Sequence, residues 1–144
     1  MLDLRRRLAD IVAIPITPFR DGEIALDEYR AVLDRMLDAG IRVVTPNGNT
    51  GEFYALSPAE RSLMLETTCD AVGGRALVLA GVGFDVRTAI ADGRAAGAAG
   101  AAAVMIHQPV HPYVSGLGWV DYHAEIAAEL PGMGVVPYVK DARI

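Results

Sequence analysis

Short apolar runs recur along the chain, and longer stretches with helical spacing separate them. The runs cover residues 11–16, 41–46, 76–82, 102–107 and 134–139. Each run is continuously apolar rather than alternating, which predicts strands covered on both faces, as in a parallel sheet. The alternation of strand and helix predicts an α/β fold built from repeated βα units.

Four helices are expected to follow the first four strands. The apolar positions of the first, within residues 26–40, fall on one helical stripe: Tyr29, Val32, Leu33, Met36 and Leu37. Asp27 can cap its start and Gly40 can end it. This spacing predicts an amphipathic helix packed against the sheet.

The second helix has a clear start signal in its sequence. Ser57, Pro58 and Glu60 form the pattern of a capping box with proline at the first helical position. The capping box is followed by Leu63, Met64, Thr67 and Val72. The third helix, over about residues 85–97, is rich in alanine and glycine, which predicts close packing on the sheet. The fourth is expected over residues 119–130, before a Pro-Gly pair.

Five strands and four helices in one alternating series fit two architectures. A doubly wound open sheet can be complete at 144 residues. A (β/α)8 barrel needs eight strands and usually about 250 residues. Length alone favours the open sheet, so motifs must decide.

Composition excludes several classes of function. The formal net charge is -5 and the 13 Lys and Arg residues are scattered, which argues against a nucleic-acid partner. The single Cys69 cannot form an internal disulfide, so a reducing, cytoplasmic setting is expected. The longest stretch without charged residues, residues 95–120, is interrupted by histidines, prolines and glycines, so we expect no membrane span.

Residues 48–52, GNTGE, follow the second strand and form a candidate anion cradle. Glycines let a backbone approach a ligand closely, and Asn49, Thr50 and loop N–H groups can donate to a carboxylate or phosphate. The Asn-Gly and Thr-Gly dipeptides of this region are also common in ordinary turns. A ligand-binding loop and a plain turn therefore both remain open. Glu52 is expected to be a buried structural carboxylate that accepts loop N–H bonds.

Histidines and a tyrosine follow the fourth strand. His107 and His111 have a four-residue spacing, but Pro109 and Pro112 exclude the helix that would direct both at one metal ion, so no metal site is expected. His111 could act as an acid or base, or be a hydrogen-bonded loop residue. His123, on the fourth helix, is expected at the surface.

Tyr138 ends the fifth strand. Its ring can pack in the core, with a partner for its hydroxyl, or its hydroxyl can take part in catalysis. Lys140, two residues later, is a possible Schiff-base amine only if it is desolvated. An exposed lysine is the simpler interpretation.

Several segments together resemble the dihydrodipicolinate synthase / N-acetylneuraminate lyase family of class I aldolases, over about residues 11–143. They are IVAIPITPF, GNTGEFYALSPAER, AGVG, the proline-containing loop after the fourth strand, and Tyr138. The resemblance implies a (β/α)8 TIM barrel. Residues 1–144 would be a single N-terminal portion with about the first five strands and four helices, and the C-terminal half would be absent.

The resemblance also implies chemistry. Family members form a Schiff base between a strand-six lysine and a pyruvate-like or sugar-derived 2-keto acid, without a cofactor, and they are expected to be homo-oligomers. Substrate binding falls on Asn49, Thr50 and Gly51, and proton relay falls on Tyr138. His111 aligns best with a tyrosine that synthases donate across a dimer interface. A small shift of the alignment would place Tyr113 at that position instead. Arg143 stands near the position of a carboxylate-binding arginine.

Three departures qualify this expectation. Asn49 replaces a second threonine of the synthase relay, and an amide cannot shuttle a proton as a hydroxyl can. The loop after the fourth strand has His111 where the synthases have a tyrosine. GNTGEF looks closer to the sugar-acid dehydratase and aldolase branches than to the lysine-biosynthetic synthases. The Schiff-base lysine of the family lies more than twenty residues beyond the tyrosine, so Lys140 cannot be that lysine. We therefore expect the 144-residue chain to be inactive alone; the alternatives are a non-catalytic keto-acid or carboxylate binder and a truncated, inactive family member.

Overall fold

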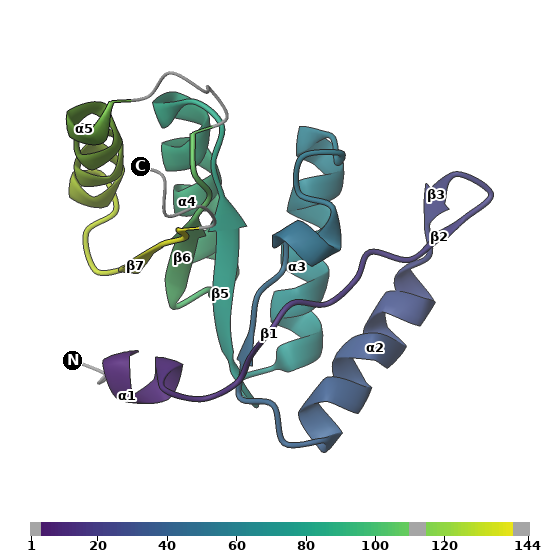
Figure 1. Ribbon diagram of the computed structural model, residues 1–144. Helices are drawn as coiled ribbons and strands as arrows, with labels where there is room; N and C mark the ends of the chain where they lie inside the picture. Colours follow the sequence, from purple (N-terminus) through teal and green to yellow (C-terminus); the bar gives the residue numbers. More distant parts are fainter. Residues whose placement is uncertain (1–3, 110–114, 140–144) are drawn as a thin grey trace.

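A computed structural model describes residues 4–109 and 115–139. Within them, parallel strands form one sheet in the order β1-β4-β5-β6-β7, which is also their order along the chain (Figure 1). The strands are β1 (Val12–Ala13), β4 (Val43–Val44), β5 (Leu77–Val82), β6 (Ala103–Ile106) and β7 (Gly134–Pro137). A doubly wound sheet reverses its strand order at a switch point, whereas this sheet always adds the next strand on the same side. The arrangement is therefore that of a barrel wall.

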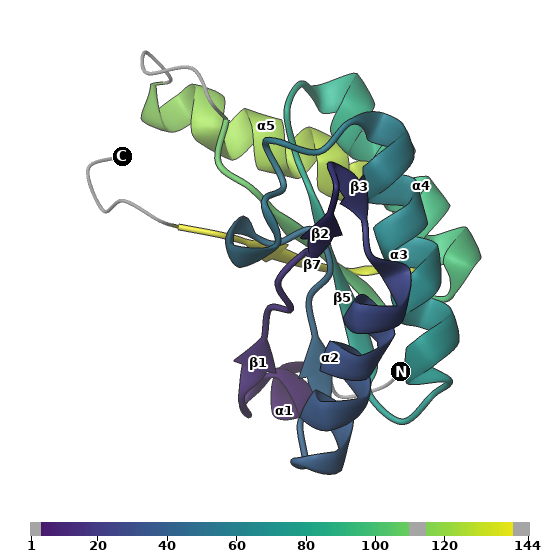
Figure 2. The same ribbon diagram turned by 90° about the vertical axis from the view of Figure 1, so that its right-hand side faces the viewer.

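Four long helices cover the outer face of this sheet (Figures 1 and 2). They are α2 (Leu26–Asp38), α3 (Pro58–Val72), α4 (Val86–Ala99) and α5 (Gly116–Ala128). Each corresponds to a predicted helix, and α5 begins three residues earlier than expected because Ser115 caps it. The predicted stripe of α2 is confirmed, with Tyr29, Leu33 and Leu37 buried. Capping by Asp27 was wrong, because α2 begins at Leu26 with Ala25 as its N-cap.

The start of α3 follows the predicted capping box. The backbone N–H of Glu60 donates to Ser57 Oγ at 3.3 Å, and the N–H of Ser57 donates to the Glu60 carboxylate at 2.7 Å. Met64, Thr67 and Val72 of this helix are buried, whereas Leu63 is 39% exposed. The predicted close packing of α4 on the sheet is confirmed, because Ala89 and Ala96 are fully buried in the cluster that joins the helices to the strands. A Cβ atom on Gly93 would lie only 2.6 Å from a methyl carbon of Leu130, so α4 also packs closely against the segment after α5.

Two apolar clusters lie on opposite faces of the sheet. The outer cluster joins the strands to α2–α5. The inner cluster contains Val43, Leu77, Leu79, Ala103 and Met105. Leu4 and Leu8 of the short helix α1 (Leu4–Leu8) pack against this inner cluster, at the end of the sheet where the strands begin (Figure 1). Neither α1 nor the hairpin of β2 (Phe19–Arg20) and β3 (Glu23–Ile24) was predicted from the sequence.

The sheet has two open edges within the described residues, β1 and β7. The prediction that both strand faces are covered is correct for β4, β5 and β6, whose residues are all buried. It was wrong at the edges, where Ile11, Ile16 and Val139 are 66%, 52% and 53% exposed. The paired part of β1 is also short, because Pro15 has no N–H group to continue the ladder.

Candidate functional site

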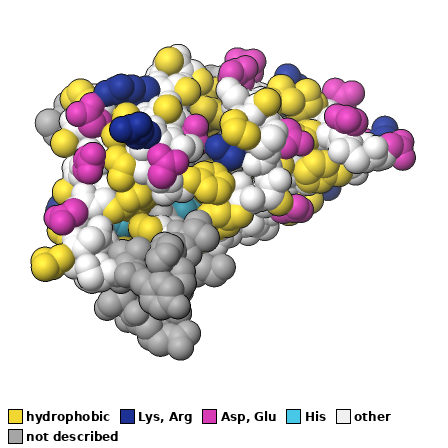
Figure 3. All heavy atoms as spheres, turned by 90° about the horizontal axis from the view of Figure 1, so that it is seen from above, with side chains coloured by type: hydrophobic (Ala, Val, Ile, Leu, Met, Phe, Trp, Pro, Cys, Tyr) yellow, Lys and Arg dark blue, Asp and Glu magenta, His cyan; other side chains and the backbone are white. Residues whose placement is uncertain are grey.

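The described residues that follow β4, β5, β6 and β7 lie at one end of the sheet. In parallel α/β folds this end binds ligands. In the view onto this end, histidine atoms are visible beside apolar side chains (Figure 3). The region from Thr45 to Leu56 provides most of the polar groups at this end of the sheet.

The loop after β4 forms a single 3₁₀ turn, η1 (Asn49–Gly51). The N–H groups of Gly51 and Glu52 donate to the carbonyl oxygens of Gly48 and Asn49 at 3.0 and 3.1 Å. No hydrogen bond among the described residues uses the N–H groups of Asn49 or Thr50. The Thr50 side chain is exposed. Two N–H donors and one hydroxyl are therefore available to an anion at this turn.

The two glycines of this turn are needed by the fold itself. A Cβ atom on Gly48 would lie 2.5 Å from Cγ2 of Ile14, and one on Gly51 would lie 3.0 Å from the carbonyl oxygen of Pro15. Thr17 Oγ1 also donates to the carbonyl oxygen of Gly51 at 2.8 Å. The glycines thus let the turn pack against the segment after β1, in addition to any approach by a ligand.

Glu52 does not have the structural role expected for it. Its side chain is exposed rather than buried, and among the described residues its carboxylate accepts no hydrogen bond. Its backbone lies in the left-handed region with a φ of 62°. The turn is held by backbone hydrogen bonds and by Thr17 instead.

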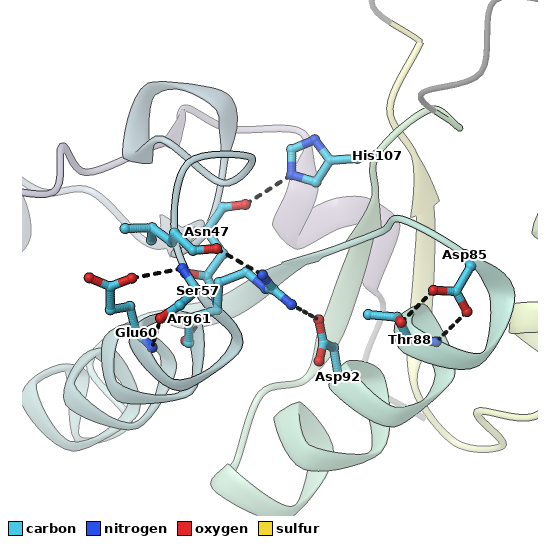
Figure 4. A network of polar contacts seen from close by, with 9 residues as sticks. Asn47, Ser57, Glu60, Arg61, Asp85, Thr88, Asp92 and His107 are labelled. Atoms are coloured by element: carbon cyan, nitrogen blue, oxygen red, sulfur yellow. Dashed lines mark hydrogen bonds and ion pairs between the residues drawn. The ribbon is translucent and has the colours of Figure 1, made fainter.

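Asn47 and His107 connect the loop after β4 to the end of β6. His107 is 1% exposed, and its Nε2 donates to the carbonyl oxygen of Asn47 at 2.9 Å (Figure 4). The Asn47 side-chain amide donates to the carbonyl oxygen of Arg61 at 3.0 Å. Gly81 makes this contact possible, because a Cβ atom there would lie 1.9 Å from the Asn47 oxygen. His107 is thus a buried residue of the candidate site.

An aromatic cluster surrounds His107. The Phe53 ring is fully buried and stacks on His107 and Phe84, with ring centroids 4.1 and 4.8 Å apart. The Tyr54 ring meets His107 and Phe84 at steep angles, at 5.4 and 5.6 Å. The guanidinium of Arg61 lies 4.7 Å from the centroid of Phe84 and 5.4 Å from that of Phe53. These contacts hold the rings in one packed unit.

Arg61 is a buried cation on α3, next to the aromatic cluster, and is 6% exposed. Its NH1 donates to the carbonyl oxygen of Leu56 at 3.0 Å, and its NH2 lies 3.5 Å from the carboxylate of Asp92 (Figure 4). Burial raises the pKa of Asp92, and the positive charge of Arg61 opposes this rise. Arg61 therefore joins α3, α4 and the end of the site loop.

Tyr138 follows β7, and its N–H donates to the carbonyl oxygen of Ile106 at 2.9 Å. Its ring centroid lies 6.0 Å from that of His107. The pKa of Tyr54 is raised by burial and by the nearby Tyr138 phenol. Among the described residues, no hydrogen bond joins Thr50 to Tyr138.

Several predicted site residues cannot be placed. His111, Tyr113, Lys140 and Arg143 lie outside the described residues. Among residues 4–109 and 115–139, no group of three His, Cys, Asp or Glu side chains could hold a metal ion. No helix in the same ranges is long and apolar enough to cross a bilayer.

The sequence model of the dihydrodipicolinate synthetase family matches residues 7–143. The chain belongs to this family. The resemblance stated from the sequence motifs is thereby confirmed. Named relatives in the dihydrodipicolinate synthetase family include synthases, dehydratases and a lyase, so the chain belongs to a family of aldolases and dehydratases.

Two curated relatives are each 34% identical to the chain. One is 4-hydroxy-tetrahydrodipicolinate synthase of Nitratidesulfovibrio vulgaris, matched over 117 residues, or 81% of this chain. The other is probable 5-dehydro-4-deoxyglucarate dehydratase 1 of Streptomyces coelicolor, matched over 128 residues, or 88% of this chain. Each match covers only 40% of the relative. The chain therefore spans well under half of the length of these relatives.

A solved structure shows the same relation in three dimensions. The crystal structure of dihydrodipicolinate synthase from Bacillus clausii is 48% identical and superposes with a TM-score of 0.95. The superposition covers 98% of this chain and 48% of that chain. The expected fold is confirmed: the chain has the first strands and helices of the (β/α)8 barrel of the dihydrodipicolinate synthetase family.

Five residues of the candidate site were not predicted from the sequence: Asn47, Phe53, Tyr54, Arg61 and Phe84. Arg61 could have been found, because it precedes Met64 and Leu65 by three and four positions on the buried stripe of α3. Phe84 has a φ of 69°, unusual for a bulky residue, and backbone strain of this kind clusters at functional sites. No sequence pattern predicts that conformation.

His123 of α5 was wrongly expected at the surface. It is 6% exposed, and its Nδ1 bonds to the carbonyl oxygen of Trp119 at 2.7 Å. Burial lowers its pKa, and this hydrogen bond opposes the change. The missed signal is again helical spacing, because His123 lies three residues before the buried Ile126.

Proposed function

We propose that this chain supplies the carboxylate-binding half of a Schiff-base-dependent lyase, an aldolase or a dehydratase, that acts on pyruvate-like or sugar-derived 2-keto acids. Residues 1–144 act as a single N-terminal portion of the barrel domain. A part of the barrel that this chain does not contain supplies the Schiff-base lysine. The limited share of the relatives' length that the chain covers supports this proposal.

One observation carries the proposal: the turn Asn49–Gly51, at the carboxyl end of β4, has N–H donors that the fold does not use. A carboxylate of a 2-keto acid can accept from the N–H groups of Asn49 and Thr50 and from the Thr50 hydroxyl. Thr17 and Gly51 fix the turn against the segment after β1, so little ordering is needed when a ligand binds.

Tyr138 is the proposed proton carrier of the assembled site. A Schiff base makes the neighbouring carbon of the substrate acidic, and a positioned phenol can then exchange a proton with it. Tyr138 follows β7 and points to the same inner side of the sheet as the apolar cluster around Met105. His111 and Arg143 remain proposed as further acid–base and carboxylate-binding residues.

Asn49 favours the sugar-acid branch of the family. Its amide can bind a ligand but cannot relay a proton as a hydroxyl does. Relatives named as a synthase and as a probable dehydratase are each 34% identical to the chain, so this choice rests on Asn49. The exposed edge residues Ile11, Ile16 and Val139 support a second polypeptide segment, or a further copy in a homo-oligomer, that covers the open sheet.

Calorimetric titration of pyruvate into the chain tests the carboxylate site. Binding is expected to be saturable, and Thr50→Val is expected to weaken it about tenfold, as for the loss of a hydrogen bond to a charged group. Thr50→Ser keeps the hydroxyl and is expected to bind as the unaltered chain does. Unchanged binding in Thr50→Val would contradict the assignment.

Reduction with borohydride in the presence of pyruvate separates binding from Schiff-base chemistry. The isolated chain is expected to show no covalent adduct by intact mass. An adduct at Lys140 would overturn the proposal that the reactive lysine lies elsewhere. Binding with no turnover even in the assembled barrel would favour a carboxylate-binding protein without catalytic activity.

A further inference from the structure

Tyr54 belongs to the aromatic cluster of the candidate site but has no role in the proposed lyase function. Its neighbour Phe53 is fully buried, whereas Tyr54 is 46% exposed. The Tyr54 ring packs edge-on against three rings, those of Phe53, Phe84 and His107, at 5.0, 5.6 and 5.4 Å. The ring is thus fixed by its buried face, and part of the side chain stays open to solvent.

The phenol of Tyr54 has spare hydrogen-bonding capacity. Its hydroxyl donates to the carbonyl oxygen of Gln108 at 3.4 Å, which is long for an O–H donor. The oxygen can also accept a hydrogen bond, since a phenol is both donor and acceptor. The contact with Gln108 can therefore be exchanged for one with a ligand at little cost.

Two phenols flank the same imidazole. His107 lies 5.4 Å from the Tyr54 ring and 6.0 Å from the Tyr138 ring, between centroids. The two phenols also interact electrostatically. Tyr54 reaches this position four residues after Thr50, so the carboxylate-binding turn and the two phenols belong to one end of the sheet.

We propose that Tyr54 determines substrate specificity by hydrogen-bonding a hydroxyl group that the 2-keto acid carries beyond its keto carbon. This inference rests on the function proposed above and narrows its substrate class to hydroxylated 2-keto acids. A preorganised polar group that bonds a substrate hydroxyl discriminates against the analogue that lacks it. Tyr54 suits this task because its ring is already held by Phe53, Phe84 and His107.

Two keto acids that differ by one hydroxyl group test the proposal: 2-oxobutanoate and 4-hydroxy-2-oxobutanoate. The chain is titrated with each by calorimetry. We expect it to bind the hydroxylated acid about fivefold more tightly, the effect of one neutral hydrogen bond. Tyr54→Phe is expected to remove this preference and to leave the affinity for 2-oxobutanoate unchanged.

Tyr122→Phe is the matched control. The Tyr122 hydroxyl donates to the carbonyl oxygen of Phe84 at 3.0 Å and is thus occupied within the fold. This variant is expected to keep the preference. A preference that persists in Tyr54→Phe, or that the unaltered chain lacks, overturns the role of Tyr54 and leaves the carboxylate site intact. Failure of the unaltered chain to bind either acid overturns the proposed function and this inference with it. Near-ultraviolet circular dichroism verifies that each variant is folded.

Discussion

Replacing Arg61 with methionine removes the buried cation that joins α3, α4 and the site loop. Methionine keeps an unbranched apolar stem against the rings of Phe53 and Phe84. It cannot donate to the Leu56 carbonyl oxygen, which Arg61 NH1 approaches to 3.0 Å. It also leaves the Asp92 carboxylate without its ion-pair partner. The variant therefore isolates the polar role of Arg61 from its packing role.

The cost can be worked out from three contacts. A buried carbonyl oxygen that loses its donor costs about 1–3 kcal/mol. The cation over two rings contributes about 1 kcal/mol. The ion pair with Asp92 is long at 3.5 Å and Asp92 is 31% exposed, so it adds only about 0.5 kcal/mol. Since neighbouring contacts do not add in full, we expect a loss of about 2–4 kcal/mol in the free energy of unfolding.

Urea denaturation followed by circular dichroism measures this loss. A fall of about 3 kcal/mol lowers the midpoint by about 1–3 M urea at the slopes of about 1–3 kcal/mol per M that small proteins show. Arg75→Met is the control: Arg75 pairs with Asp34 at 2.8 Å, but their side chains are 49% and 56% exposed. This exposed pair is expected to contribute about 0.5 kcal/mol. An Arg61→Met midpoint equal to that of Arg75→Met would refute the reasoning.

Two other predictions concern the close contact between Gly81 and Asn47 and the titration of His123. Gly81→Ala puts a Cβ atom 1.9 Å from the Asn47 carbonyl oxygen, so we expect it to cost about 3 kcal/mol in urea denaturation. Gly116→Ala, where nothing lies within 4 Å, should change stability by less than about 1 kcal/mol. The folded-state pKa of His123 is lowered by burial, so the unfolded chain binds this proton more readily and stability should fall as the pH drops below about 6.5. In thermal melts across this pH range, the melting temperature of His123→Gln should depend less on pH than that of the unaltered chain. An equal dependence would contradict the lowered pKa of His123.

Features governed by local chemistry were predictable from the sequence. Ser57 and Glu60 satisfy each other's backbone N–H groups within one turn, so their role depends on no distant residue. The apolar stripe of α2 and the buried runs of β4, β5 and β6 likewise follow from spacing and composition. The choice between an open sheet and a barrel required the family motifs, because strand order is not encoded in any single βα unit.

Features governed by long-range packing were not predictable. His107 bonds to a carbonyl oxygen sixty positions earlier in the chain, and no pattern in the HQPVHPYV segment indicates that partner. The sequence suggested that the glycines at positions 48 and 51 bind a ligand. Their close contacts with Ile14 and Pro15 leave no room for a side chain, so the fold itself needs glycine there. Phe84, whose φ is positive, contacts Phe53, Arg61 and Tyr122, which come from three different parts of the chain. Thr50 and Tyr138 stay predictions, because their roles need a bound substrate.

Amide spectra of the isotopically labelled chain during titration with pyruvate test the central claim most directly. A carboxylate bound at the turn must perturb the N–H groups that donate to it. The account predicts saturable shifts that are largest for the amides of Asn49 and Thr50, while amides at the opposite end of the sheet stay unchanged. The largest shifts elsewhere in the chain, or no saturable shift at all, would contradict it.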